Sequence, residues 1–175
     1  MKKSELIIPA DMDILKRKAV IYGLLDEITN GLQTANQMKL LAPSDYSGYQ
    51  AAYILLKQAG RIDDAFKELR YARMNLPSFP FALCGDMVNY ELVKHEQDGD
   101  TIHFEKALAY IKHFLKKEKP SISDVVECYL TAADLYLQLE DADKVIECLV
   151  AAEKPVFSYN NGVLFGEYTP QQLLS

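Results

Sequence analysis

The sequence predicts an all-α fold built from antiparallel helix hairpins, and three observations lead to this prediction. Apolar residues recur at helical spacing along most of the chain. One apolar face reappears 80 residues after its first occurrence, at Tyr129 as at Tyr49. Glycines and prolines stand where helices would reverse or stop. With 175 residues, 49% of them apolar, the chain can bury a core, and disorder is not expected.

Residues 11–41 are expected to form the first pair of helices. A long amphipathic helix, DMDILKRKAVIYGLLDEI, precedes a predicted break at Asn30 and Gly31, and a shorter helix runs to about Leu41. We interpret residues 1–43 as a degenerate repeat or a terminal cap, because an array of stacked helix pairs needs an end unit with one polar face.

The clearest hairpin follows the helix start marked by Pro43 and Ser44. Gly60 is expected to reverse the chain in a left-handed conformation, and Pro77 to close the second helix. Two alanines on the second helix would let the paired backbones approach closely. The two apolar faces consist of Tyr49, Ala52, Tyr53 and Leu56, and of Ile62, Ala65, Leu69 and Ala72.

A looser hairpin is expected after residue 80. Its first helix is longer, the turn falls at Asp98 and Gly99, and Asp100 or Thr101 would cap the second helix. Its apolar faces are Phe81, Cys84, Gly85 and Val88, followed by Ala107, Ile111 and Phe114.

The last hairpin begins after Pro120, where Ser121 and Asp124 form a predicted capping box. Its faces repeat the pattern of the clearest hairpin. They consist of Tyr129, Ala132, Ala133 and Tyr136 on the first helix, and of Val145, Leu149 and Ala152 on the second.

This spacing resembles the tetratricopeptide repeat, a 34-residue helix pair with the pattern W-x2-L-G-x2-Y, A-x3-F and P. Gly60, Ala65, Ala72 and Pro77 match that pattern directly. Tyr49, Ala52, Tyr53 and Leu56 stand at its four first-helix positions. The resemblance implies an α-α superhelix, with three such hairpins in residues 44–154.

The resemblance also implies that the first helices line a concave face, on which residues not needed for packing are free to bind. The candidate binding residues include both polar and apolar side chains, unlike the lysine- and asparagine-rich clamp with which some family members hold a C-terminal carboxylate. Each could instead pack against the end of the chain. The candidates are Gln50, Ile54, Lys57, Gln58, Asp86, Asn89, Tyr90, Leu130, Asp134, Leu137 and Gln138.

Residues 155–175 are predicted to form an irregular or hairpin-like tail, because Asn161 and Gly162 lie between the apolar stretches VFSY and VLF. Two interpretations stay open. The tail covers the edge of the last repeat, or it lies in a groove of its own or a neighbouring molecule. The second would allow a homodimer.

No catalytic, cofactor or metal-binding pattern is recognised. His95, His103 and His113 lack the spacing of metal ligands, and no phosphate-binding glycine loop or nucleophile elbow occurs. Cys84, Cys128 and Cys148 are interpreted as buried structural residues. We therefore expect no enzyme and no cofactor.

Charge and hydropathy set the remaining expectations. Residues 1–80 hold 11 basic and 9 acidic residues, a net charge of +2, whereas residues 81–175 hold 8 and 16, a net charge of −8. This balance argues against nucleic-acid binding. Neither a signal peptide nor a membrane span is recognised, and the odd number of cysteines fits a reducing compartment, so a cytoplasmic protein is expected.

The leading hypothesis is a scaffold that binds a peptide or protein segment, because helical repeats provide area without a reacting group. One alternative is the peptide-sensing C-terminal half of a helix-turn-helix transcriptional regulator. Another is a structural protein that self-associates through its repeat ends or its tail.

Overall fold

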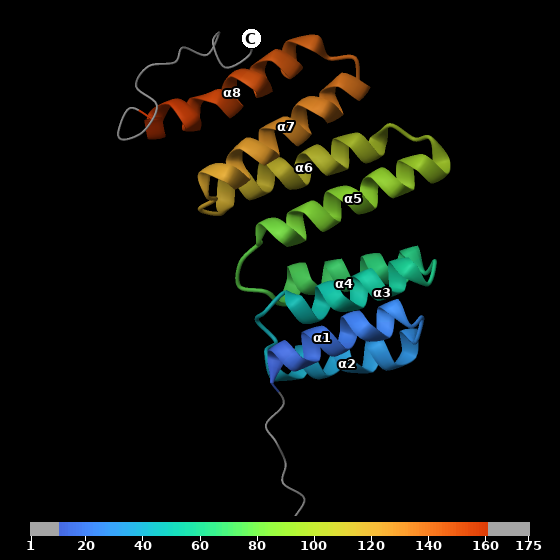
Figure 1. Cartoon of the computed structure of the whole chain (residues 1–175). Helices are drawn as coiled ribbons and strands as arrows, with labels where there is room; N and C mark the ends of the chain where they lie inside the picture. Colours follow the sequence, from blue (N-terminus) through green and yellow to red (C-terminus); the bar gives the residue numbers. More distant parts are fainter. Residues whose placement is uncertain (1–10, 161–175) are drawn as a thin grey trace, which may run out of the picture. The chain divides into compact units, whose positions relative to one another are not determined.

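Eight α-helices follow one another in the computed structural model, which describes residues 11–160, the last six by their backbone only (Figure 1). No strand occurs in this range, so the all-α prediction is confirmed for the described residues. The chain divides into two units, Met1–Met87 and Val88–Ser175, with the boundary inside α5. The helices are α1 (Met12–Leu24), α2 (Ile28–Leu41), α3 (Ser47–Gln58), α4 (Ile62–Asn75), α5 (Phe81–Asp98), α6 (Ile102–Lys117), α7 (Ile122–Gln138) and α8 (Ala142–Asn160).

Three of the four hairpins reverse through the same hydrogen-bonded turn. After α1, the Asp26 N–H donates to the carbonyl of Gly23 and the Glu27 N–H donates to that of Tyr22. The bonds after α3 and α7 have the same spacing, and one residue in each turn has positive φ. This pattern is the Schellman motif, which satisfies the last helical carbonyls. The three left-handed residues are Asp26 (φ 57°), Gly60 (φ 72°) and Glu140 (φ 56°).

The hairpin between α5 and α6 turns differently. Gly99 is also left-handed, with φ 73°, but its N–H donates to the carbonyl of His95, four residues earlier. This single bond closes the simpler αL motif. The predicted turn is confirmed, and so is the cap by Asp100, whose carboxylate accepts from the Ile102 N–H at 2.9 Å.

Small residues hold α2 close to α3 in the first unit. Ala35 and Ala52 are almost fully buried. A methyl group on Gly48 would lie 2.8 Å from the backbone nitrogen of Lys39 and 3.2 Å from the carbonyl oxygen of Ala35. The sequence placed such an approach at Ala65 and Ala72 of α4, which are buried. The close contact at Gly48 instead joins α3 to α2, and the sequence pattern did not mark that glycine.

The second unit is built on the same principle. Alanines at 107, 132, 133 and 152 are buried, together with Cys128 and Cys148. The capping box is confirmed, because the Ser121 hydroxyl accepts from the Asp124 N–H while the Asp124 carboxylate accepts from the Ser121 N–H. Leu149 is 44% exposed, so its assignment to the core is wrong. Cys148, one position earlier, faces inward instead.

The predicted position of the first break is also wrong. The first break lies at Leu25–Glu27 and not at Asn30 and Gly31, which belong to α2. Gly31 is a packing residue, since a Cβ there would lie 2.8 Å from Cδ1 of Leu55. An aspartate at position 26 can take the left-handed conformation that the turn requires, because a short polar side chain tolerates it better than most.

The end of the helical array also departs from expectation. α8 continues to Asn160, so residues 155–160 are helical where an irregular tail was predicted. The signal at Asn161 and Gly162 falls outside the described residues. At the other end of the described chain, Ile14, Ile21 and Leu25 are exposed apolar residues, and the charged residues Arg17 and Lys18 are exposed between the first two.

The close approach at Gly48 gives a matched pair of substitutions. Gly48→Ala should lower the free energy of unfolding by about 1 to 3 kcal/mol, because the added methyl group meets backbone atoms that cannot rotate away. Gly85→Ala, in α5 with nothing within 4 Å of the new Cβ, should instead raise it by roughly 0.5 to 1 kcal/mol. Urea unfolding followed by circular dichroism measures both. Equal effects would contradict the proposed packing.

Candidate binding groove

An open groove of about 470 Å³ lies between α1 and α3 in the first unit. Both helices contribute walls, and Met38 of α2 also lines the cavity. Three of the residues predicted to bind, Gln50, Ile54 and Gln58, lie here. The full lining consists of Lys16, Ala19, Val20, Gly23, Leu24, Met38, Ser47, Gln50, Ala51, Ile54, Leu55 and Gln58.

The two helices that form the groove run parallel. Near their first residues, Oγ of Ser47 contacts Sδ of Met12 at 4.0 Å. Near their last residues, the side-chain amide of Gln58 donates to the carbonyl oxygen of Gly23 at 2.7 Å. The 12 residues of α3 rise by roughly 18 Å, which is the length of about five residues of extended chain.

The walls of the groove present apolar side chains to solvent. Val20, Leu24 and Ile54 are 62%, 82% and 53% exposed. Lys16 is the only charged residue that lines the cavity in the described part of the chain. The surface is therefore suited to apolar anchors and carries little charge.

A polar cluster around Asp86 fixes the α3 wall. The Asp86 carboxylate accepts from the Tyr46 hydroxyl at 2.7 Å and from the Gln50 amide at 3.0 Å. The Tyr53 hydroxyl reaches the Asp86 backbone carbonyl at 3.5 Å. Burial, and then the nearby Asp86 charge, raises the pKa of Tyr53 to about 12. Burial and the bond to Asp86 also raise the pKa of Tyr46, so both phenols stay neutral donors.

The other predicted residues of the first unit have different surroundings. Lys57 does not line the cavity, and its ammonium group lies 6.0 Å from the centroid of the Tyr53 ring. Asp86 acts as the acceptor described above. It orders the groove wall from behind and is not part of the lining.

The predicted residues of the second unit lie on two helices, α5 and α7. Asn89 is exposed, whereas Tyr90 is buried and belongs to the core. Four exposed positions on α7 complete the set, at Leu130, Asp134, Leu137 and Gln138. None of them lies in the groove of the first unit.

Sequence reasoning missed the α1 wall, which contributes Lys16, Val20 and Leu24. Val20 and Leu24 are four residues apart, so a second apolar stripe on this helix was visible in the sequence. It was overlooked because the segment was interpreted as a cap.

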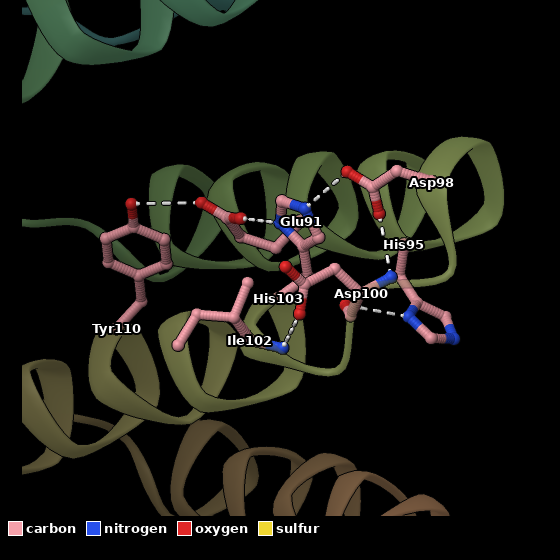
Figure 2. A network of polar contacts seen from close by, with 7 residues as sticks. All are labelled: Glu91, His95, Asp98, Asp100, Ile102, His103 and Tyr110. Atoms are coloured by element: carbon pink, nitrogen blue, oxygen red, sulfur yellow. Dashed lines mark hydrogen bonds and ion pairs between the residues drawn. The ribbon is translucent and has the colours of Figure 1, made fainter.

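A second polar cluster ties α5 to α6 (Figure 2). His103 lies between two carboxylates, with Nδ1 2.6 Å from Oε2 of Glu91 and Nε2 3.0 Å from Oδ2 of Asp98. Glu91 and His103 are buried, and the Tyr110 hydroxyl donates to the other oxygen of Glu91 at 3.4 Å. Since both ring nitrogens face acceptors, the arrangement favours the doubly protonated imidazolium.

The charges of this cluster follow from its contacts. The hydrogen bond to Glu91, and then that to Asp98, raises the pKa of His103 although burial opposes the shift. The Asp100 N–H, and then His103, lowers the pKa of Asp98. Nearby, Nδ1 of His95 donates to the backbone carbonyl of Asp100 at 2.9 Å (Figure 2). The cluster is thus an internal clamp on the hairpin, and one that the histidine spacing did not reveal.

The cysteines of the described range are structural residues rather than a reactive or metal-binding group. The three cysteines are free thiols and buried, as predicted, and burial raises the pKa of Cys148. No group of three or more potential metal ligands is found among residues 11–160. None of the helices described there is long and apolar enough to cross a membrane.

Comparison with known proteins gave no assignment: no protein-family model matches this chain, and no curated protein matches it.

The clamp predicts a specific pH dependence. Because the pKa of His103 is raised on folding, its contribution to stability is complete below its ordinary value of 6.5 and is lost as the pH rises through the raised value. The contribution of Asp98 is present above 3.8 and is lost as the pH falls. Urea unfolding between these limits should therefore give the largest free energy of unfolding, with a decline as the pH rises through the raised pKa of His103.

Two histidine variants distinguish the His103 clamp from other causes of the pH dependence of stability. His103→Gln should lower the free energy of unfolding at pH 6 by roughly 3 kcal/mol, since it removes the cation from a buried pair. It should also flatten the decline of the free energy of unfolding that is expected as the pH rises. His95→Gln, in the same turn but bonded to a carbonyl oxygen, should leave that decline in place. An unchanged pH profile in His103→Gln would rule out the clamp as its origin.

Proposed function

We propose that this protein is a non-enzymatic scaffold of the tetratricopeptide type, which binds a peptide or protein segment in the groove between α1 and α3. The recurrence of one turn supports the repeat. Asp26 and Gly60 take the same place in successive hairpins and are 34 residues apart, the length of that repeat. Parallel packing of α1 and α3 is what stacked hairpins require of their first helices.

The exposed apolar walls of the groove are the observation that carries the proposal. Covering Val20, Leu24 and Ile54 would remove apolar area from water, a gain of about 1 kcal/mol or more for each half-exposed side chain. The amides of Gln50 and Gln58 already have acceptors within the protein. A partner can therefore bind through apolar anchors without having to satisfy buried polar groups.

The lining also restricts the kind of partner. Because Lys16 is the only charged lining residue among those the structure describes, the groove lacks the concentration of charge that phosphate or a strongly charged peptide would need. We expect a segment of about five extended residues with two or three apolar side chains. A cytoplasmic location, without nucleic acid as ligand, is part of the same proposal.

The groove can be tested with a displayed library of random peptides selected on the full chain. Selected peptides should bind Ile54→Lys at least roughly tenfold more weakly, because a charge would then be desolvated on the apolar wall. Met74→Lys is the matched control, since Met74 is 78% exposed on α4 and lies outside the groove. Fluorescence anisotropy measures the affinities. No enrichment of peptides, or equal loss in both variants, would refute the proposal.

Self-association is a second candidate, favoured by the exposed apolar side chains of Ile14 and Ile21 on α1 and of Leu25 directly after it. Exposed apolar residues on the end unit of an array are suited to packing against another copy. Sedimentation velocity at high micromolar concentration should then show a dimer that Ile21→Glu converts to monomer, while Met74→Glu stays dimeric. A monomeric wild-type protein would exclude this candidate.

A further inference from the structure

The second unit contains a cavity of its own, of about 380 Å³, between α6, α7 and α8. Its size falls within the range of small-molecule sites. The walls are mainly apolar. They include Leu108, Ile111 and Leu115 of α6, Ala132 of α7, and Cys148 and Ala151 of α8.

Two ammonium groups lie beside this apolar space. Nζ of Lys112 and Nζ of Lys144 are 5.7 Å and 5.1 Å from the centroid of the Tyr136 ring, and all three residues line the cavity. Such distances allow cation–π attraction, which holds both cations at the cavity.

The two lysines differ in what else they contact. Lys144 pairs with Asp141 at 2.8 Å, and Glu147 lies one turn after it on the same wall. Lys112 has no carboxylate within ion-pair distance among residues 11–154. Within residues 11–154, the cavity thus combines an apolar interior with the Glu147 carboxylate and with one ammonium group, that of Lys112, that takes part in no ion pair.

We propose that this cavity binds a small organic monocarboxylate with an apolar body, such as a medium-chain fatty acid. The apolar chain occupies the space between the three helices, and the carboxylate accepts a charge-assisted hydrogen bond from Lys112. The ligand is expected to carry only one negative charge, because Lys144 is already paired with Asp141 and Glu147 adds a negative charge to the same wall. The site is independent of the groove in the first unit and of the function proposed for it.

Isothermal titration calorimetry of the full chain with decanoate tests the site. We expect saturable binding of one molecule per chain, weakened at least tenfold in Lys112→Gln. Lys116→Gln is the matched control, because it removes an exposed lysine of the same helix that does not line the cavity, and it should leave the affinity unchanged. Decyltrimethylammonium, with the same chain length and the opposite charge, should bind at least tenfold more weakly than decanoate.

Thiol labelling gives an independent measure of where decanoate binds. Cys148 lines the cavity, whereas Cys84 and Cys128 do not. Decanoate should slow the alkylation of Cys148 several-fold and leave the other two rates unchanged, as measured by mass spectrometry of the digested protein. Protection of all three thiols would indicate general stabilisation and overturn the site.

The remaining outcomes are equally decisive. Absence of saturable binding, equal affinity for the cationic probe, or equal loss in Lys112→Gln and Lys116→Gln would overturn the proposal. The only carboxylate side chain in residues 161–175 is that of Glu167. Glu167→Gln should not alter decanoate affinity, and a tenfold rise would assign the cavity to that segment of the chain instead.

Discussion

The reversal of the chain through a single left-handed residue is the constraint on which the rest of the structure depends. In three hairpins the same two hydrogen bonds close the turn, and they fix where each second helix starts relative to the first. Only one residue in each turn needs positive φ, so glycine is favoured but not required. Asp26 and Glu140 take that conformation and Gly60 takes it freely. Because the turn recurs, the first helices of neighbouring pairs can lie parallel, as α1 and α3 do.

The hairpin of α5 and α6 shows what changes when this turn is replaced. Its first helix is longer, its turn is closed by one bond instead of two, and a buried ion pair adds a fixed register between the helices. A buried carboxylate and imidazolium hold this register only while both are charged. Part of the contact between these two helices is therefore an ion pair instead of an apolar contact, and the strength of that ion pair depends on pH.

The sequence located most helices and turns for physical reasons that act within a few residues. Gly60, Gly99 and the capping box at Ser121 each satisfy backbone groups of their own helix, so neighbouring residues suffice to recognise them. One prediction failed because a glycine had two possible roles. Gly31 resembled a turn residue, yet it lies within α2, where its lack of a side chain leaves room for Leu55, 24 positions later in the chain.

The sequence by itself determined that the described chain is helical and paired, because apolar spacing and helix ends are local properties. It also identified Gln50, Ile54 and Gln58 as one wall of a groove. Only the tertiary structure decided that α1 supplies the opposite wall, that Asp86 holds the α3 wall through hydrogen bonds, and that Lys112 and Cys148 share a cavity. Each of these depends on contacts between residues far apart in the chain, and no local pattern encodes the distance between them.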